Sequence, residues 1–375
     1  MKSRCFLIKP ASGACNMKCT YCFYRDEVSE RSVKNYGMMS EETADILIKR
    51  ALEETDGPVA FAFQGGEPSL MGLDWYRHFV SAVHTLDKNH RSSFAFQTNG
   101  YIIDREWASF FRENNFLVGL SMDGSRRIHD MYRRGNDGEG SFRRVYAAAE
   151  ALSAENAQFN ILVTVTRDVA ENIETLMPFF LRNGFRYLQF IPCLDPLGDK
   201  GQEYSLTPDI FTEFLKKLFV YYYNSWRDGH YISIRYFDNL VSMKCGNPPE
   251  ECGMAGVCSD SYCVVEADGS VFPCDFYVLD GYEMGNIRTD SLSSLDKRRK
   301  GMGFVEKSLS LPEECRTCSV FSLCHGGCRR EREDYTTGEM GLNRLCSSYK
   351  EFLTFADKAL STMAYWETEA KRNGD

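Results

Sequence analysis

Apolar and polar positions follow two different periods along the first half of the chain. Six short apolar runs have the length of buried strands, and each ends in a polar or glycine-containing turn. They are FLIKP, VAFAFQGG, SFAFQTNG, FLVGLSMDG, FNILVTVT and YLQFIPC. Because longer stretches of a different period separate them, the pattern predicts a repeat of βα units rather than a set of hairpins.

The stretches between these runs are amphipathic with a helical period. They include SEETADILIKRALEE, DREWASFFREN, SFRRVYAAAEALSAEN and ENIETLMPFFLRN. Ser40 and Asp104 stand where an N-cap residue is expected, each followed by acidic or polar first-turn residues. We therefore predict an α/β fold, a partial (βα)6 TIM-like barrel, with its site at the carboxyl ends of the strands.

Most cysteines gather near the two ends of the chain. Cys15, Cys19 and Cys22 lie in CNMKCTYCFY, in the turn after the first predicted strand, and the next cysteine is Cys193. Three thiolates on one tight loop suit an iron–sulfur cluster in which one iron lacks a protein ligand. A structural zinc site would need a fourth Cys or His, and a zinc knuckle completed by a distant residue remains the alternative.

The last third of the chain is irregular and carries a second set of cysteines. VVEADGSVFPCDF predicts a hairpin that turns at Asp268-Gly269, and His325 is expected to be a turn residue rather than a ligand. Eight thiols in this region are enough for two four-iron clusters, with two zinc sites as the alternative. They are Cys252, Cys258, Cys274, Cys315, Cys318, Cys324, Cys328 and Cys346.

Composition narrows the class of protein. The 375 residues include 53 acidic and 44 basic ones, a net charge of −9, with no basic tract, which argues against a nucleic-acid partner. We find no export signal and no apolar stretch near the roughly 20 residues that span a bilayer, so we expect a cytoplasmic, monomeric protein that does not bind membranes. In the cytosol, 15 cysteines indicate metal binding rather than disulfides.

The CxxxCxxC spacing, with Tyr21 before its last cysteine, resembles the radical S-adenosylmethionine enzymes. That resemblance implies that the amino and carboxylate groups of S-adenosylmethionine complete the open iron. It also implies contacts to this cosubstrate, although an arginine in such a basic stretch as Arg126 to Arg134 is commonly a solvated surface charge. The implied contact residues are Tyr21, Gly66, Ser121, Arg133 and Leu194.

From Cys258 onward the spacing resembles the SPASM extension of radical enzymes that modify peptides. The resemblance implies three 4Fe-4S clusters in all and a division of residues 1–235, 236–350 and 351–375 into barrel, SPASM domain and C-terminal helix. Cys5, Cys193, Cys245 and Cys263 are left over, and we expect buried small hydrophobic residues there. The implied auxiliary ligand sets are Cys252, Cys258, Cys274 and Cys328, and Cys315, Cys318, Cys324 and Cys346.

Four stretches, LIKPASGACNMKCTYCFY, FAFQGGEP, SIRYFDNL and VFPCDFYVLDGY, together resemble the anaerobic sulfatase-maturating enzymes. The resemblance implies oxidation of a Cys or Ser in a C/S-x-P-x-R segment of a sulfatase to Cα-formylglycine, by radical abstraction of hydrogen from Cβ. It makes Asp275, in PCDFY, the proton acceptor and the auxiliary clusters the electron route. The implied partners are the sulfatase polypeptide and a low-potential electron donor of flavodoxin or ferredoxin type.

Two other classes of function remain open from the sequence. Another SPASM enzyme, for example one that forms thioether crosslinks, would cleave the cosubstrate but ignore the sulfatase peptide. A non-catalytic iron–sulfur or zinc module that serves as carrier or scaffold would not cleave S-adenosylmethionine at all.

Overall fold

The computed structural model of the chain describes residues 3–199 and 201–373. They form two compact units that alternate along the sequence. Unit 1 comprises residues 3–122, 129–160 and 259–304, and unit 2 comprises residues 123–128, 161–258 and 305–373. Because the chain passes between the units several times, the division at residues 235 and 350 stays a prediction.

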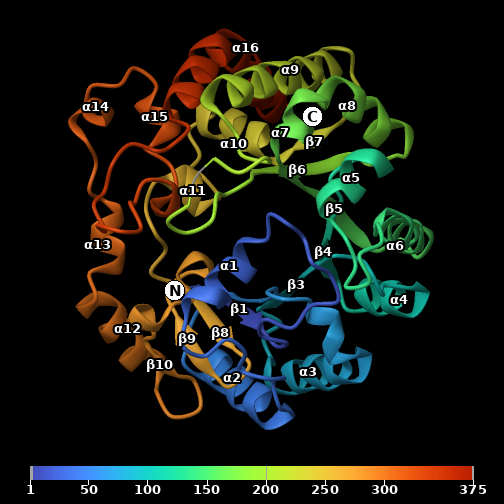
Figure 1. Cartoon of the computed structure of the whole chain (residues 1–375), viewed down its shortest axis with the longest axis vertical. Coiled ribbons are helices and arrows are strands. Elements are labelled where there is room, and N and C mark those ends of the chain that lie inside the picture. The colour runs from blue at the N-terminus through green and yellow to red at the C-terminus, as the bar shows by residue number, and fades with distance from the viewer. Residues whose placement is uncertain (1–2, 200, 374–375) are drawn as a thin grey trace. The chain divides into compact units, whose positions relative to one another are not determined.

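Unit 1 is built on parallel strands that match the first four predicted runs. These are β1 (Arg4–Lys9), β2 (Val59–Phe63), β3 (Ser92–Thr98) and β4 (Phe116–Ser121), each paired in parallel with the next. The neighbour of β1 on its other side is β8 (Tyr262–Glu266), also parallel. Figure 1 shows this strand, coloured orange, beside the blue β1.

The predicted hairpin is confirmed, since β9 (Ser270–Phe272) pairs antiparallel with β8 across Asp268-Gly269. The two-residue β10 (Gly285–Asn286) then pairs with β9, and the strand order in unit 1 is β10-β9-β8-β1-β2-β3-β4. The sequence did not indicate that this hairpin would extend the parallel sheet at β1. Its docking there brings the segment after β9 to the end of β1.

The helices of unit 1 begin where the sequence predicts. The side chain of Ser40 accepts a hydrogen bond from the Thr43 amide at 3.1 Å, and that of Asp104 accepts one from the Trp107 amide at 3.1 Å. Both caps are confirmed. The helical elements are α1 (Phe23–Glu30), α2 (Glu41–Glu53), η1 (Pro68–Met71), α3 (Leu73–Leu86), α4 (Arg105–Glu113), α6 (Phe142–Ala154), η2 (Asp275–Tyr277), η3 (Asp280–Tyr282) and α12 (Leu292–Gly301); α5 (Arg126–Tyr132) spans both units.

Aromatic side chains fill the core of unit 1 on one face of its strands. Phe63 and Phe116 are fully buried, and the Phe63 ring centroid lies 5.0 Å from those of both Tyr76 and Phe79 on α3. Phe94 and Phe116 stack across adjacent strands at 4.9 Å. Such packing resists changes of register, because a one-residue slip would turn these rings to the other face. The loops at the carboxyl ends of the strands are therefore held in fixed positions.

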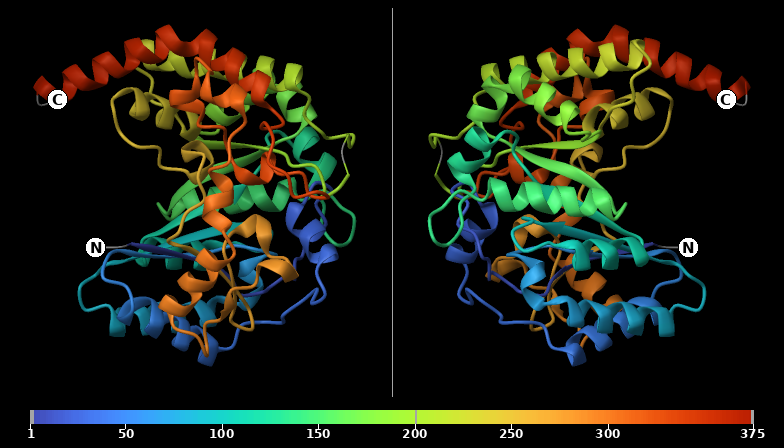
Figure 2. Two further views of the ribbon diagram at one scale, coloured as in Figure 1. Left: turned by 90° about the vertical axis from the view of Figure 1, so that its left-hand side faces the viewer. Right: turned by 90° about the vertical axis from the view of Figure 1, so that its right-hand side faces the viewer.

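The last two predicted strands lie in unit 2, apart from residues 158–160 of the first of them, which belong to unit 1. The strands β5 (Gln158–Val165), β6 (Tyr187–Pro192) and β7 (Ser233–Ile234) are parallel neighbours. The long α16 (Cys346–Asn373) packs against α9 (Pro208–Arg227) and α10 (Arg235–Lys244), as the red and yellow-green helices of Figure 2 show. The remaining helices are α7 (Arg167–Glu171), α8 (Ile173–Arg182), α11 (Cys252–Ala255), α13 (Phe304–Ser308), α14 (Glu313–Arg316), α15 (Phe321–Cys324) and η4 (Arg329–Glu331).

The predicted α/β class is confirmed: all six predicted runs form strands, and the sheet is open rather than a closed barrel. Cys252, Cys315 and Cys324 of unit 2 lie in helices of four residues each, as expected of an irregular region, whereas Cys346 begins the long α16. Within the described residues, no helix is long and apolar enough to cross a membrane.

Candidate active site

The cysteine loop connects β1 to α1 at the carboxyl end of the strand, where the βα pattern predicts it. Cys22 is the N-cap residue of α1, and all three thiols are partly buried. The amide of Lys18 donates to the carbonyl of Arg134 at 2.8 Å, and that of Thr20 donates to the carbonyl of Tyr132 at 3.0 Å. These backbone bonds tie the cysteine loop to the end of α5 and to the segment that follows it.

The turns after β2 and β3 also hold the cysteine loop. The Glu67 amide donates to the Ala14 carbonyl at 2.8 Å, and Asn99 Nδ2 lies 3.6 Å from Cys15 Sγ. Glu67 in turn accepts the Asn99 amide at 2.7 Å, and burial raises the pKa of its carboxyl group. Neither Glu67 nor Asn99 was predicted as a site residue, although both stand in turns that follow predicted strands.

Close packing against the cysteine loop requires a glycine at position 66, in the turn after β2. Gly66 has φ of +53°, and a Cβ on it would come within 2.2 Å of the Ala14 carbonyl oxygen. Because glycine has no Cβ, the turn can lie directly against the cysteine loop. Ser121, at the end of β4, is buried, and its Oγ accepts a hydrogen bond from Gln97 Nε2 at 3.0 Å.

Arg133 lies beside Tyr21, which is part of the cysteine loop. Both are buried, and the guanidinium carbon of Arg133 lies 5.4 Å from the centre of the Tyr21 ring. The alternative of a solvated surface charge for Arg133 is wrong, since its exposed fraction is only 6%. Leu194 follows β6 in unit 2 and is partly buried. Four of the five predicted cosubstrate contacts thus belong to unit 1, and their roles stay predictions.

Asp275 has two partners from neighbouring strands of unit 1. Its Oδ1 forms an ion pair with Nζ of Lys9, the last residue of β1, and its Oδ2 accepts a hydrogen bond from Gln64 Nε2, just after β2, at 2.7 Å. Asp275 is 8% exposed and Lys9 is fully buried. Neither partner was predicted from the sequence. Their only signal was a polar residue at the end of an apolar run.

Burial raises the pKa of several thiols in both cysteine-rich regions. Burial raises the pKa of Cys15 to about 11, with smaller contributions from the Glu67 carboxylate and Cys22. In unit 2, burial raises the pKa of Cys324 to about 11 and that of Cys328 to about 12. These thiols are therefore protonated near pH 7, and a metal that binds them must displace the protons.

In unit 2 several thiols of the predicted ligand sets lie near enough to influence one another's pKa values. After burial, the next causes that raise the thiol pKa values are largely other cysteines: Cys315 and Cys318 act on both Cys324 and Cys346. For Cys328 the Glu331 carboxylate comes first after burial, and Cys252 and Cys258 add smaller contributions that also raise its pKa. Cys274 belongs to unit 1, so its membership of the ligand set with Cys252, Cys258 and Cys328 stays a prediction.

Soft thiolate donors in sets of three and four suit iron–sulfur clusters. Within the described residues, no three His, Cys, Asp or Glu side chains are placed to hold a single metal ion. The thiols are therefore shown to be neighbours in pairs, through their influence on one another's pKa values. His325 caps α15 in the left-handed region, with φ of +49°, and Nδ1 lies 2.8 Å from the Met254 carbonyl oxygen. It is the turn residue that the sequence predicts.

The four remaining cysteines match the prediction only in part. Cys193 and Cys263 are buried, as expected of small hydrophobic residues, and Arg299 Nη2 lies 3.2 Å from Cys263 Sγ. The expectation of full burial is wrong for Cys5 and Cys245, which are only partly buried.

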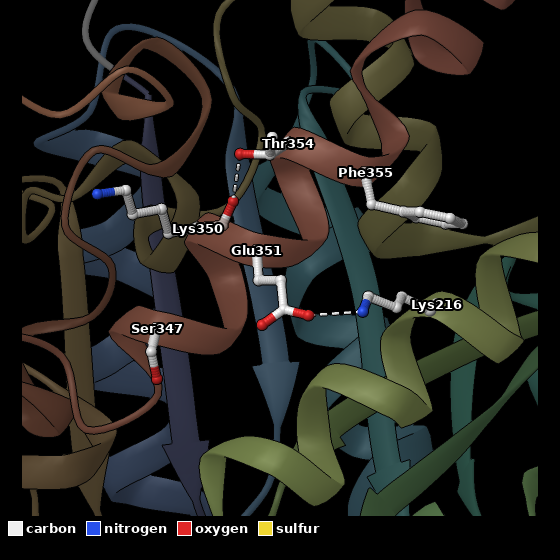
Figure 3. Close-up of a pocket in the computed structure, with 6 residues that line it drawn as sticks. All are labelled: Lys216, Ser347, Lys350, Glu351, Thr354 and Phe355. Atoms are coloured by element: carbon white, nitrogen blue, oxygen red, sulfur yellow. Dashed lines mark hydrogen bonds and ion pairs between the residues drawn. The ribbon is translucent and has the colours of Figure 1, made fainter.

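Unit 2 also has a pocket of about 500 Å³ between α9 and α16. Figure 3 shows its charged lining. Nζ of Lys216 on α9 donates a hydrogen bond to Oε1 of Glu351 on α16 at 2.6 Å, beside Phe355. None of its lining residues is a predicted site residue, although Ser347 follows Cys346 directly.

Comparison with known proteins bears on both units. Residues 10–178 match the model of the radical SAM superfamily, and residues 257–319 match that of the SPASM iron–sulfur cluster-binding domain. The chain is 42% identical to the cysteine-type anaerobic sulfatase-maturating enzyme of Clostridium novyi, over 97% of each chain. It is 29% identical to the serine-type enzyme of Bacteroides thetaiotaomicron, over 92% of this chain and 87% of that one.

A solved structure gives the same relationship. The structure of native anSMEcpe with bound AdoMet and the Cp18Cys peptide is 42% identical in sequence and has a TM-score of 0.92. The match covers 97% of this chain and 99% of that one, so it includes both cysteine-rich regions.

Proposed function

The chain belongs to the anaerobic sulfatase-maturating enzymes of the radical SAM superfamily, and we propose that it oxidises a cysteine in a Cys-x-Pro-x-Arg segment of a sulfatase to Cα-formylglycine. The choice of cysteine follows from relatives, since the cysteine-type enzymes are 42–44% identical and the serine-type enzymes 27–29%. A low-potential protein of flavodoxin or ferredoxin type supplies the electrons.

Three sets of cysteines bind three 4Fe-4S clusters. Cys15, Cys19 and Cys22 hold the first, with S-adenosylmethionine on its open iron, near Tyr21, Gly66, Ser121, Arg133 and Leu194. When bound, these groups supply a 5′-deoxyadenosyl radical that removes hydrogen from the substrate Cβ, and the auxiliary clusters take up one electron. The auxiliary ligand sets are Cys252, Cys258, Cys274 and Cys328, and Cys315, Cys318, Cys324 and Cys346.

A residue of the chain must accept a proton from the substrate during the reaction. Loss of a hydrogen atom from Cβ leaves a carbon radical beside the S–H group, and loss of one electron and one proton then gives a C=S double bond. Water converts the thioaldehyde to the aldehyde and releases hydrogen sulfide. Asp275 accepts the proton, because a positioned carboxylate accelerates such a transfer by about 10²–10⁴-fold.

The observation that carries this proposal is the pairing of Asp275. Each carboxylate oxygen has one partner, Lys9 or Gln64. A carboxylate oxygen has two lone-pair positions, so each can still accept a further hydrogen bond.

One experiment tests the reaction. Anaerobically reconstituted protein is incubated with S-adenosylmethionine, a low-potential reductant and matched peptides that differ only in Cys or Ser at the target position. We expect 5′-deoxyadenosine and a peptide aldehyde, with more aldehyde from the Cys peptide. Cleavage of the cosubstrate without aldehyde from either peptide would point to another peptide modification, and absence of cleavage to a carrier or scaffold.

The role of Asp275 is tested by Asp275→Asn, which keeps the shape and removes the basicity. We expect normal iron content and 5′-deoxyadenosine formation, but aldehyde formation lower by about 10²-fold or more. The matched control is Asp56→Asn at an exposed position of the same unit, which should behave as wild type. Near-normal aldehyde yield from Asp275→Asn, measured by mass spectrometry of the peptide, would exclude Asp275 as the essential base.

A further inference from the structure

Lys9 is an unusual lysine, because its side chain is fully buried at the end of β1. Buried lysines are rare unless a partner offsets the loss of hydration. Lys9 has two such partners. Its Nζ forms the ion pair with Asp275 and lies 3.7 Å from the centre of the Tyr24 ring, the distance of a cation–π contact.

The surroundings of Tyr24 make that ring a rigid support. The Tyr24 hydroxyl donates a hydrogen bond to Glu266 on β8, and Arg31 pairs with the same carboxylate at 2.8 Å. The side chains of Arg31 and Glu266 are both fully buried. The hydrogen bond to Glu266 holds the face of the Tyr24 ring against the Lys9 ammonium, which it attracts.

Gly65 provides the space through which the Lys9 side chain passes. Its φ is +91°, and a Cβ on it would lie 2.5 Å from Cγ, 2.9 Å from Cδ and 2.9 Å from Nζ of Lys9. Such contacts are far shorter than van der Waals distances, so any side chain at position 65 must displace Lys9. Gly65 therefore serves Lys9, whereas its neighbour Gly66 packs against the cysteine loop.

We propose that Lys9 is a positioning residue, which holds the Asp275 carboxylate in the orientation for proton transfer, and that Gly65 is the opening that admits it. This inference rests on the proposed function. Lys9 ends β1 and Gln64 follows β2, and these two strands are paired in register. The two contacts therefore hold both oxygens of Asp275 from adjacent strands and fix the plane of the carboxylate.

The first test is a double-mutant cycle with Lys9→Met, which keeps length and removes charge. Alone it leaves the Asp275 anion buried without its cation, so we expect a lower thermal midpoint of the reconstituted protein. Lys9→Met with Asp275→Asn leaves neither charge, and the midpoint should recover. The double variant reports on stability alone, because it lacks the Asp275 carboxylate; a midpoint that does not recover would argue against the Lys9–Asp275 charge pair.

Kinetics of Lys9→Met give a second measure. We expect kcat for aldehyde formation to fall by about 10–100-fold, because a misplaced reacting group costs rates of this order. The KM for the peptide should change less than about threefold, since Lys9 acts through Asp275 and not on peptide binding. Lys88→Met, at an exposed position of unit 1, is the control and should match wild type.

Gly65→Ala tests the opening without changing any charge. We expect the same fall in kcat as for Lys9→Met, and no further fall when the two changes are combined. Gly72→Ala is the matched control, because Gly72 also has a positive φ, +80°, but a Cβ there would meet nothing within 4 Å. It measures the cost of backbone strain alone.

The outcomes separate this inference from the reaction on which it rests. A wild-type protein that forms no aldehyde overturns the proposed function. An active wild type with an unchanged kcat in Lys9→Met overturns the positioning role alone, as does a Gly65→Ala variant no slower than Gly72→Ala. If Lys9→Met does not fold, the comparison of Gly65→Ala with Gly72→Ala still decides the question.

Discussion

The two units hold their cysteines in opposite ways. In unit 1 three thiols lie on one short loop that is bonded through its backbone to neighbouring turns. In unit 2 seven predicted ligands are spread from Cys252 to Cys346, and α11, α14 and α15 have four residues each. Helices of that length are not stable alone. The comparison indicates that the sheet preforms the first site, whereas metal binding and local folding are coupled in unit 2.

The largest effect should come from Cys328→Ala. Loss of one ligand removes a cluster that joins distant segments, so we expect low soluble yield and loss of the auxiliary iron. Iron analysis and the yield of soluble protein measure this. Cys245→Ala, at a partly buried thiol of the same unit, is the control. Full iron and normal stability in Cys328→Ala would show that the assigned ligand set is wrong.

Replacing Cys15, Cys19 and Cys22 together by Ala should leave a folded protein. We expect iron to fall from about 12 to about 8 per chain, since each 4Fe-4S cluster contributes four, and cosubstrate cleavage to vanish. Circular dichroism should remain that of wild type, because the backbone bonds of the loop do not need the thiols. Cys5→Ala, at a partly buried thiol on β1, should keep all iron. Cleavage of S-adenosylmethionine by the triple variant would refute the assignment.

A glycine in unit 2 tests whether its loops are as closely packed as the ligand map requires. Gly256 has φ of +68°, and a Cβ there would lie 2.0 Å from the His325 carbonyl oxygen. Gly256→Ala must separate the segment of Cys252 and Cys258 from that of Cys324, so we expect reduced auxiliary iron. Gly246→Ala, at φ of +90° with nothing within 4 Å, should retain it. Equal iron in both variants would argue against this packing.

The smallest effect is expected from Asp104→Ala in unit 1. Loss of the N-cap of α4 should lower the free energy of unfolding by about 1 kcal/mol. Asp104→Asn keeps an oxygen that can accept the Trp107 amide and should cost less. Both variants should hold full iron, because the cysteine loop depends on strand packing and not on this helix end. Loss of iron in Asp104→Ala would mean that unit 1 is less preformed than we infer.

The sequence by itself determined the local elements and the kind of chemistry. Strands of unit 1 such as FLIKP and VAFAF were recognisable because burial of parallel strands leaves a continuous apolar run between turns. The caps at Ser40 and Asp104 were equally local, since a cap bonds an amide three residues away. The cysteine loop was recognised for the same reason: its three thiols are close in sequence.

Only the tertiary structure decided what surrounds Asp275. The β8–β9 hairpin pairs with β1, and nothing in its residues indicates that edge, because backbone pairing carries little sequence information about the partner strand. That docking places Asp275 against Lys9 and Gln64, and the missing Cβ of Gly65 lets Lys9 reach it. A buried charge pair between segments far apart in sequence depends on the packing of both, which no local pattern records.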